Sequence, residues 1–180
     1  FYTLQDGEPA TGRIRLTTRD ALAPATLLAA DAGLFAALYL GTLLDDVAGI
    51  AFTSISIGNI AYLQGDFPAA IAAYRRSFDL NRTMAHADGE SRAIEGLGRV
   101  YLAQGDYAAA LEAFDAVLND KRMQQARGRL GSAAQNVGDV HFRLGNLDAS
   151  RASYEESRGH FEAVGDQPNV GRVLQATAIT

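Results

Sequence analysis

Three side chains of different chemistry recur at one spacing along the chain. Asn59, Arg99 and Asp139 follow one another at steps of 40 residues. An amide, a guanidinium and a carboxylate together supply neutral and charged hydrogen-bonding groups of both kinds. Such a set suits recognition of a peptide backbone and of charged side chains, whereas covalent catalysis needs a nucleophile beside a base. The spacing therefore predicts a binding surface, provided that the fold places equivalent positions in one row.

Other residues accompany these three at the spacing i, i+3, i+7, i+10, which keeps side chains on one helix face. The aromatic members would act as anchors, and the polar members would bind backbone or charged groups. The alternative is that all of them are solvated residues on an unused wall. The predicted partner-binding groove consists of Phe52, Asn59, Tyr62, Arg92, Glu95, Arg99, Gln135, Asp139, Phe142 and Arg172.

Two short motifs resemble chemical sites and are better explained by structure. Gly96-x-Gly98 resembles the start of a dinucleotide loop, but it lacks the third glycine and falls inside a helical pattern rather than after a strand. His86, Asp88 and Glu90 could suggest a metal, and a polar turn between helices is the simpler reading. We therefore predict no catalytic residue, no metal and no cofactor, which makes the protein a non-enzyme.

Composition narrows the class of partner. The 180 residues carry a formal net charge of −5 and are 48% hydrophobic, as in an ordinary globular chain. A nucleic-acid binder shows a basic field, which this sequence lacks. It has no cysteine, and Lys121 is its single lysine. The arginine bias suggests a GC-rich bacterial genome. Because no charged-then-apolar leader occurs at the start, we expect a cytoplasmic protein.

The chain repeats itself with a period of 40 residues. One glycine column contains Gly65, Gly105 and Gly145, each followed by Asp or Asn. A second glycine column lies seven residues earlier in each unit, small residues lie five after the anchor, and aromatic residues lie nine after it. The small and aromatic columns are Ala70, Ala110 and Ser150, and Tyr74, Phe114 and Tyr154. Coincident columns at one period are the signature of a repeat architecture.

Each unit reads as an antiparallel helix pair. The anchor glycine ends a first helix, A, in the left-handed conformation, and the following Asp or Asn caps a second helix, B. The expected A helices lie near 46–63, 91–103 and 127–143, with a further one from about 168. The expected B helices lie near 67–83, 107–120 and 147–163. Stacked pairs bury the apolar faces that one pair alone leaves exposed.

The segment Gly96–Phe114, "GLGRVYLAQGDYAAALEAF", resembles a tetratricopeptide repeat. It carries the Leu-Gly pair, the Gly-Asp-Tyr turn, the small residue and the closing aromatic of that motif. The resemblance implies an all-α fold, a right-handed superhelical array (α-solenoid) of antiparallel helix pairs whose concave wall is lined by the A helices. The 40-residue step is similar to the long-repeat subgroup of kinesin light chains, Rap-type phosphatases and MalT-like regulators.

The chain divides into three parts on this reading. Residues 1–20 form a linker or the remnant of a preceding segment, and 21–45 form an apolar helix or helix pair packed on the array. The array covers 46–180, as repeats 46–85, 86–125 and 126–165 and a partial fourth at 166–180. A membrane span at 21–44 is the alternative for the apolar segment, and Asp31 near its middle disfavours it. We expect an apolar C-terminal end that allows self-association.

These features predict a protein–protein interaction scaffold that binds a peptide or a partner helix in the groove, without nucleic acid or membrane contact. The alternative is a sensor or regulatory segment of a larger bacterial regulator of the MalT type or of a signalling protein, where flanking sequence is missing here. An enzyme with a site inside the array is the third possibility, and no catalytic constellation supports it.

Overall fold

The computed structural model describes residues 39–40 and 46–179. Seven α-helices lie within 46–179, and no strand occurs in that range. The helices are α3 Val47–Leu63, α4 Phe67–Thr83, α5 Ala87–Gln104, α6 Tyr107–Leu118, α7 Arg127–Arg143, α8 Leu147–Ala163 and α9 Gln167–Thr177. A short 3₁₀ helix, η1, spans Lys121–Met123. The expectations for 1–20 and 21–45, and the membrane alternative for 21–44, lie outside the described residues except at positions 39–40.

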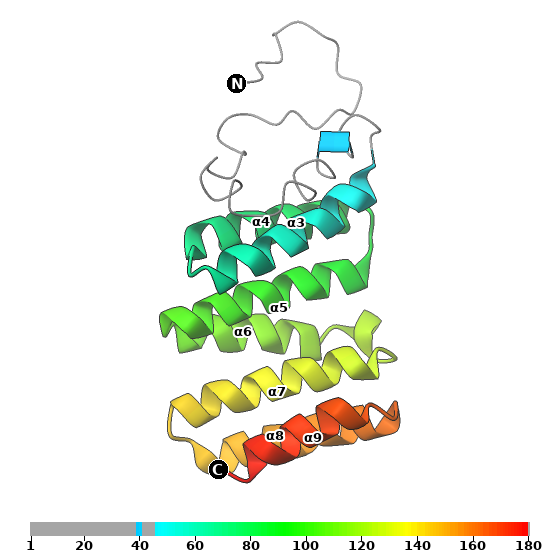
Figure 1. Cartoon of the computed structure of the whole chain (residues 1–180). Coiled ribbons are helices and arrows are strands. Elements are labelled where there is room, and N and C mark those ends of the chain that lie inside the picture. Colours follow the sequence, from blue (N-terminus) through cyan, green and yellow to red (C-terminus); the bar gives the residue numbers. More distant parts are fainter. Residues whose placement is uncertain (1–38, 41–45, 180) are drawn as a thin grey trace, which may run out of the picture.

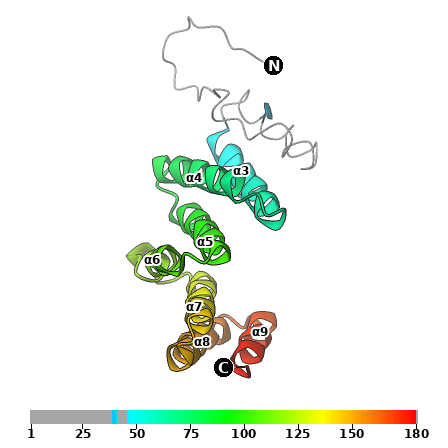
Figure 2. The same cartoon turned by 90° about the vertical axis from the view of Figure 1, so that its left-hand side faces the viewer.

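The helices follow one another in space in the order of the chain, from α3 and α4 at one end to α8 and α9 at the other (Figure 1). The pairs α3–α4, α5–α6 and α7–α8 are antiparallel, and α9 packs on α8. When the view is turned, α3 and α4 lie obliquely and the later helices are seen nearly end-on, so the helix axes rotate along the array (Figure 2). The predicted all-α array of antiparallel helix pairs is confirmed.

We keep the names A helices for α3, α5, α7 and α9, and B helices for α4, α6 and α8. Besides packing on B helices, α3 contacts α5 and α5 contacts α7. Helices α3, α5 and α7 therefore form a continuous layer, as the inner wall of a curved array requires. This layer positions the candidate site.

The turn inside each pair has the predicted left-handed glycine. The predicted cap forms at Asp66 and Asp106, whereas the Asn146 side chain makes no capping hydrogen bond to α8. Gly65, Gly105 and Gly145 have φ of 76°, 79° and 76°, a left-handed conformation that costs a residue with a Cβ atom extra free energy. Asp66 and Asp106 then cap the next helix, because each accepts a hydrogen bond of 3.1 Å from the backbone N–H three residues on. The glycine and the acid together reverse the chain within three residues.

The aromatic column fills the space between the two helices of each pair. Tyr74 and Phe114 are 0% exposed and Tyr154 is 2% exposed. A Cβ atom added at Gly98 would lie 2.5 Å from the Phe114 ring, so the inner glycine exists to admit the ring of its own B helix.

Two helix boundaries differ from the prediction. Helix α5 begins at Ala87 rather than near 91, because Asp88 and Glu90 lie in its first turn, where the helix dipole favours acids. Helix α6 ends at Leu118, and Asp120 then accepts a hydrogen bond of 2.8 Å from the Arg122 backbone N–H at the start of η1. The second B helix is therefore shorter than its two counterparts.

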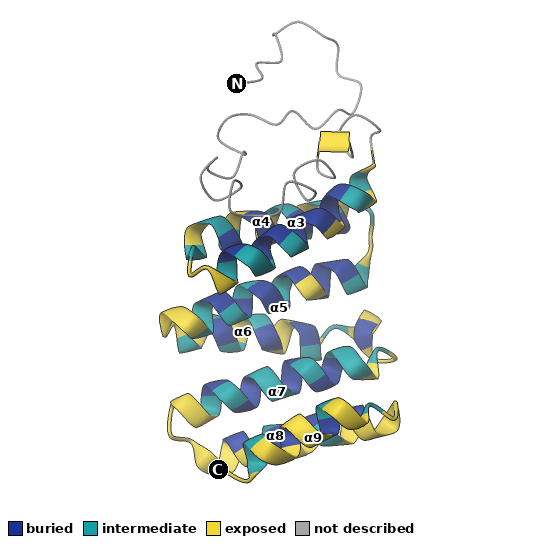
Figure 3. Ribbon diagram, in the orientation of Figure 1, coloured by how far each residue is buried: buried dark blue, intermediate teal, exposed yellow. Residues whose placement is uncertain are grey.

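Buried residues follow the helix interfaces from α3 to α7, while α8, α9 and the turns show the most exposed surface (Figure 3). Near the C-terminal end, Leu174 is 48% and Ile179 is 68% exposed. Self-association through this end stays a prediction. None of the described helices is both long and apolar enough to cross a bilayer.

Candidate functional site

All ten residues of the predicted groove lie on A helices. Helix α3 carries three of them, α5 three, α7 three and α9 one. Their burial differs widely, from an exposed Phe52 to a buried Glu95. The structure therefore separates residues that are held inside the layer from residues that face outward.

Asn59 and Arg99 are brought into direct contact. The Arg99 guanidinium donates a hydrogen bond of 2.9 Å from Nη2 to Asn59 Oδ1, and the Tyr74 hydroxyl donates one of 2.8 Å to the same oxygen. The guanidinium carbon of Arg99 also lies 5.6 Å from the centre of the Tyr62 ring, a cation–π distance. Three of the predicted groove residues thus form one cluster between the first and second repeats.

Burial raises the pKa of the Tyr74 hydroxyl, and the charge of Arg99 opposes that rise in part. The hydroxyl therefore stays protonated and acts as a donor toward Asn59. Among the described residues, Arg99 hydrogen-bonds only to neutral groups, the Asn59 amide and, at 3.5 Å, the Tyr74 hydroxyl. No carboxylate in that part of the chain lies at hydrogen-bond distance from the Arg99 guanidinium.

Asp139 is held separately, inside the third repeat. The Tyr154 hydroxyl donates a hydrogen bond of 2.7 Å to Asp139 Oδ1, in the same geometry that joins Tyr74 to Asn59. Burial raises the pKa of Asp139, and the Tyr154 hydrogen bond and the charge of Arg143 oppose the rise. Asp139 and Arg99 form no hydrogen bond or ion pair in the described part of the chain. The predicted row is therefore joined in its first half only.

Glu95 belongs to a second cluster, which links α5 to α7. Arg129 on α7 donates to Glu95 Oε2 at 3.3 Å and to Asp88 Oδ1 at 3.0 Å. Glu95 is 9% exposed, and its Oε1 has no hydrogen-bond partner among the described residues. Burial raises the pKa of Glu95 to about 7, although Arg129 and Arg99 act in the opposite direction. Arg129 was missed by the sequence reading.

The remaining predicted residues face outward to different degrees. Phe52 is 61% exposed and Phe142 is 38% exposed, which is unusual for aromatic side chains on helices. Arg92 and Arg172 are exposed, and Gln135 is half-buried. Arg92 makes no hydrogen bond or ion pair with any residue in 39–40 or 46–179. These side chains are available to a partner.

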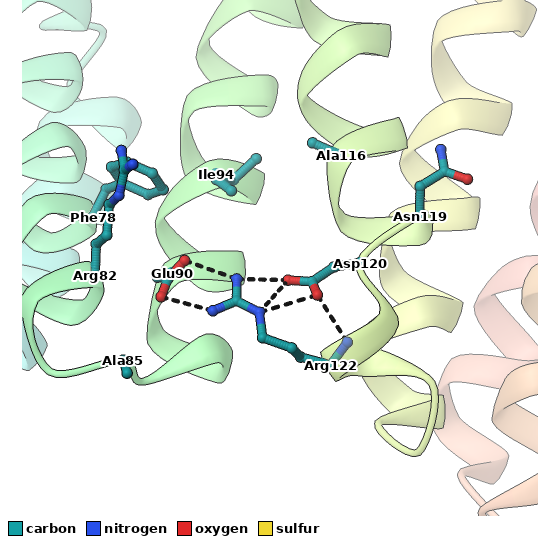
Figure 4. Close-up of a pocket in the computed structure, with 9 residues that line it drawn as sticks. All are labelled: Phe78, Arg82, Ala85, Glu90, Ile94, Ala116, Asn119, Asp120 and Arg122. Carbon is teal, nitrogen blue, oxygen red and sulfur yellow. Dashed lines mark hydrogen bonds and ion pairs between the residues drawn. The ribbon is translucent and has the colours of Figure 1, made fainter.

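A polar cluster lies outside the groove, on the side where α4, α5 and α6 meet. The Arg122 guanidinium donates to both oxygens of Glu90, at 3.1 and 2.9 Å, and to Asp120 Oδ2 at 2.8 Å. Figure 4 shows Arg122 between the two carboxylates, with Ile94 and Ala116 above them. The sequence reading missed this cluster. A signal existed, because Glu90 is equivalent by the 40-residue step to Ile50, Leu130 and Val170.

The side chains of His86, Asp88 and Glu90 have three different partners within the described residues. His86 Nδ1 lies 3.0 Å from Asn81 Oδ1, while Asp88 and Glu90 are paired with Arg129 and Arg122. Within residues 39–40 and 46–179 no three metal-binding side chains gather at one place. The segment begins α5 rather than forming the polar turn that the sequence suggested.

Stacked antiparallel helix pairs with one aromatic residue in each pair define a helical-repeat protein. Family models of the tetratricopeptide repeat match residues 46–123 and 96–163, and together these ranges cover most of the described array. The chain belongs to the tetratricopeptide repeat family, whose members generally bind other proteins. No curated protein matches the chain.

Proposed function

We propose that the array is a non-enzymatic scaffold that binds an extended peptide or a partner helix along the A helices. The observation that carries this proposal is the pair of exposed aromatic residues, Phe52 on α3 and Phe142 on α7, at either end of a continuous helical layer. Exposed aromatic side chains on such a layer are typical anchor points for a partner.

The charges of the layer support a preference for acidic side chains in the partner. The carboxylates of Glu95 and Asp88 are engaged by Arg129, and that of Asp139 is engaged by Tyr154. The guanidinium of Arg92 has no counterpart among the described residues, and the free positive charge on α5 is therefore available to a carboxylate. Opposite charges across an interface favour encounter and fix the register of a bound segment.

A pull-down from a lysate of the source cells tests the proposal. The wild-type chain is compared with Arg92→Ala and Phe52→Ala, both at exposed positions of A helices, and with Arg151→Ala, at an exposed position of the B helix α8. We expect one partner to be lost from both A-helix variants and kept by the α8 control, with all melting temperatures alike. A partner set that is the same for all four proteins would contradict the proposal.

The second candidate is a sensor or regulatory segment of a larger bacterial regulator, similar to MalT-like proteins. The 40-residue step favours it, because the subgroup that this step resembles contains such regulators. The sequence of the whole gene decides between the two, since a regulator of this type also carries a nucleotide-binding or DNA-binding domain. A gene that encodes only helical repeats would exclude it.

A further inference from the structure

An open notch lies where α4, α5 and α6 meet, and none of its lining residues belongs to the predicted groove. Its volume is about 550 Å³, within the range of roughly 300–1,000 Å³ that is common for ligand sites. Phe78 and Ile94 supply apolar surface, and Arg82 and Asn119 lie on opposite sides (Figure 4).

The notch contains a departure from the repeat pattern. Positions equivalent to Glu90 hold Ile50, Leu130 and Val170, which are 2%, 3% and 8% exposed. Glu90 is 6% exposed, so a carboxylate occupies a core position that is aliphatic in the other three helices. A buried charge is expensive unless it is paired, and Arg122 pairs both of its oxygens. Glu90 departs from the aliphatic pattern of this repeat position, and such a departure marks a candidate functional position.

The backbone beside the notch is also unusual. Ala85 has φ of 53° and is the one residue other than glycine with positive φ in the described chain. The equivalent residue two repeats later is Gly165, which adopts φ of 71° without a Cβ atom. The Ala85 methyl group lines the notch at the cost of this strain.

The charges of the lining select the occupant. Arg122 is engaged on both sides by Glu90 and Asp120, so its charge is already compensated. Arg82 is exposed and forms no ion pair within the described residues, and it lies beside Phe78 one helical turn away (Figure 4). A free guanidinium next to an apolar wall fits a carboxylate adjacent to a large apolar side chain.

We propose that this notch, which shares no residue with the predicted groove, is a second docking site for a partner segment that presents an aromatic side chain next to a carboxylate. The aromatic ring packs on Phe78, Ile94 and Ala116, and the carboxylate pairs with Arg82. The Glu90–Arg122–Asp120 cluster forms the polar end of the site and holds η1 in place.

The test is an NMR titration of the ¹⁵N-labelled 180-residue chain with the dipeptide acetyl-Phe-Asp-amide. Acetyl-Phe-Asn-amide removes the charge and acetyl-Ala-Asp-amide removes the ring. We expect saturable shifts of the Ala85, Ile94 and Asn119 amides, and weaker binding of both control peptides. Absence of saturation, equal binding of the Asp and Asn peptides, or shifts confined to A-helix groove residues would each overturn the proposal.

Variants separate the two contacts. Arg82→Gln should weaken the binding of the Asp peptide about fivefold, as expected when a partly exposed ion pair is lost. The affinity for the Asn peptide should not change. Ala116→Gln, at an exposed position of α6, should fill the notch and weaken the binding of both peptides. Arg151→Gln on α8 and Arg92→Ala on α5 should change neither. If the spectrum of the Arg82→Gln variant shows a folded protein and this variant binds the Asp peptide as tightly as the wild type does, the role of Arg82 is refuted.

Discussion

Arg99 of the second repeat donates a hydrogen bond of 2.9 Å to Asn59 of the first, and the two residues are separated by one full repeat of 40 positions. These two equivalent positions, on α3 and α5, are therefore in direct contact. Arg99 combines this bond with the Tyr62 ring at 5.6 Å, so that one side chain holds two helices of the layer together. The same residue thus contributes to the stability of the layer and to its charge.

Replacing Arg99 and replacing Arg92 should have different effects on stability. Arg99→Ala removes the bond to Asn59 and the contact with Tyr62, and should lower the free energy of unfolding by about 1 kcal/mol. Arg92→Ala removes an exposed side chain that has no partner in the described chain, and should change the free energy of unfolding little. Urea unfolding followed by circular dichroism measures both. Equal effects of the two variants would contradict the structural role of Arg99.

The inner glycines provide a test of packing with an internal control. Gly98→Ala would place a methyl group 2.5 Å from the fully buried Phe114 ring, and should destabilise the fold by about 2 kcal/mol. Gly159→Ala lies in α8 with nothing within 4 Å of the new methyl group, and should stabilise it by about 0.5–1 kcal/mol. Melting curves of the two variants should shift in opposite directions. A shift in the same direction for both would show that Gly98 is not tightly packed.

The stability of the array should depend on pH through Glu95. Its pKa is raised from 4.5 to about 7, because burial disfavours the carboxylate. The folded state therefore binds more protons than the unfolded state between these values, and the free energy of unfolding falls as pH rises from about 4.5 to about 7. The stabilisation is complete below pH 4.5 and amounts to about 3 kcal/mol.

Glu95→Gln isolates this effect, since the amide does not titrate. We expect the difference in unfolding free energy between the wild type and the variant to change across the interval from pH 4.5 to pH 7 and to be constant above it. Urea unfolding at half-unit pH steps measures the difference. A difference that is independent of pH would show that Glu95 ionises normally in the folded protein.

The repeat pattern was sufficient to predict the helix pairs. Gly65 and Asp66 determine the turn by backbone conformation and capping, and both effects act within a few residues. The Asn59–Arg99 contact could also be predicted from the sequence, because equivalent positions of stacked repeats lie close together. Local chemistry and the regular repeat thus predict most of the fold, and they predict the Asn59–Arg99 half of the row that ends at Asp139.

The pairs that break the symmetry were not predictable in this way. Arg129 bonds Asp88 and Glu95 at sequence separations of 41 and 34, and Arg122 bonds Glu90 at 32. None of these separations equals the repeat, and the side-chain reach that closes each pair depends on how far neighbouring helices lie from one another. The period therefore places Glu95 on the groove side of α5 without revealing that it is buried and paired.

Removing Arg122 and removing the Glu90 charge should have different effects on stability, because only the first change leaves a buried charge unpaired. Glu90 is 6% exposed in the intact chain, and Arg122→Ala removes the partner of its carboxylate, which should lower the melting temperature. Glu90→Leu restores the aliphatic side chain that Leu130 provides in the next repeat, and should leave the melting temperature unchanged or raise it. The double variant should resemble Glu90→Leu alone, because Arg122 then has no buried carboxylate to compensate. Differential scanning calorimetry of the three variants gives the ranking, and a Glu90→Leu protein less stable than Arg122→Ala would show that the pair stabilises the fold beyond what an aliphatic side chain provides.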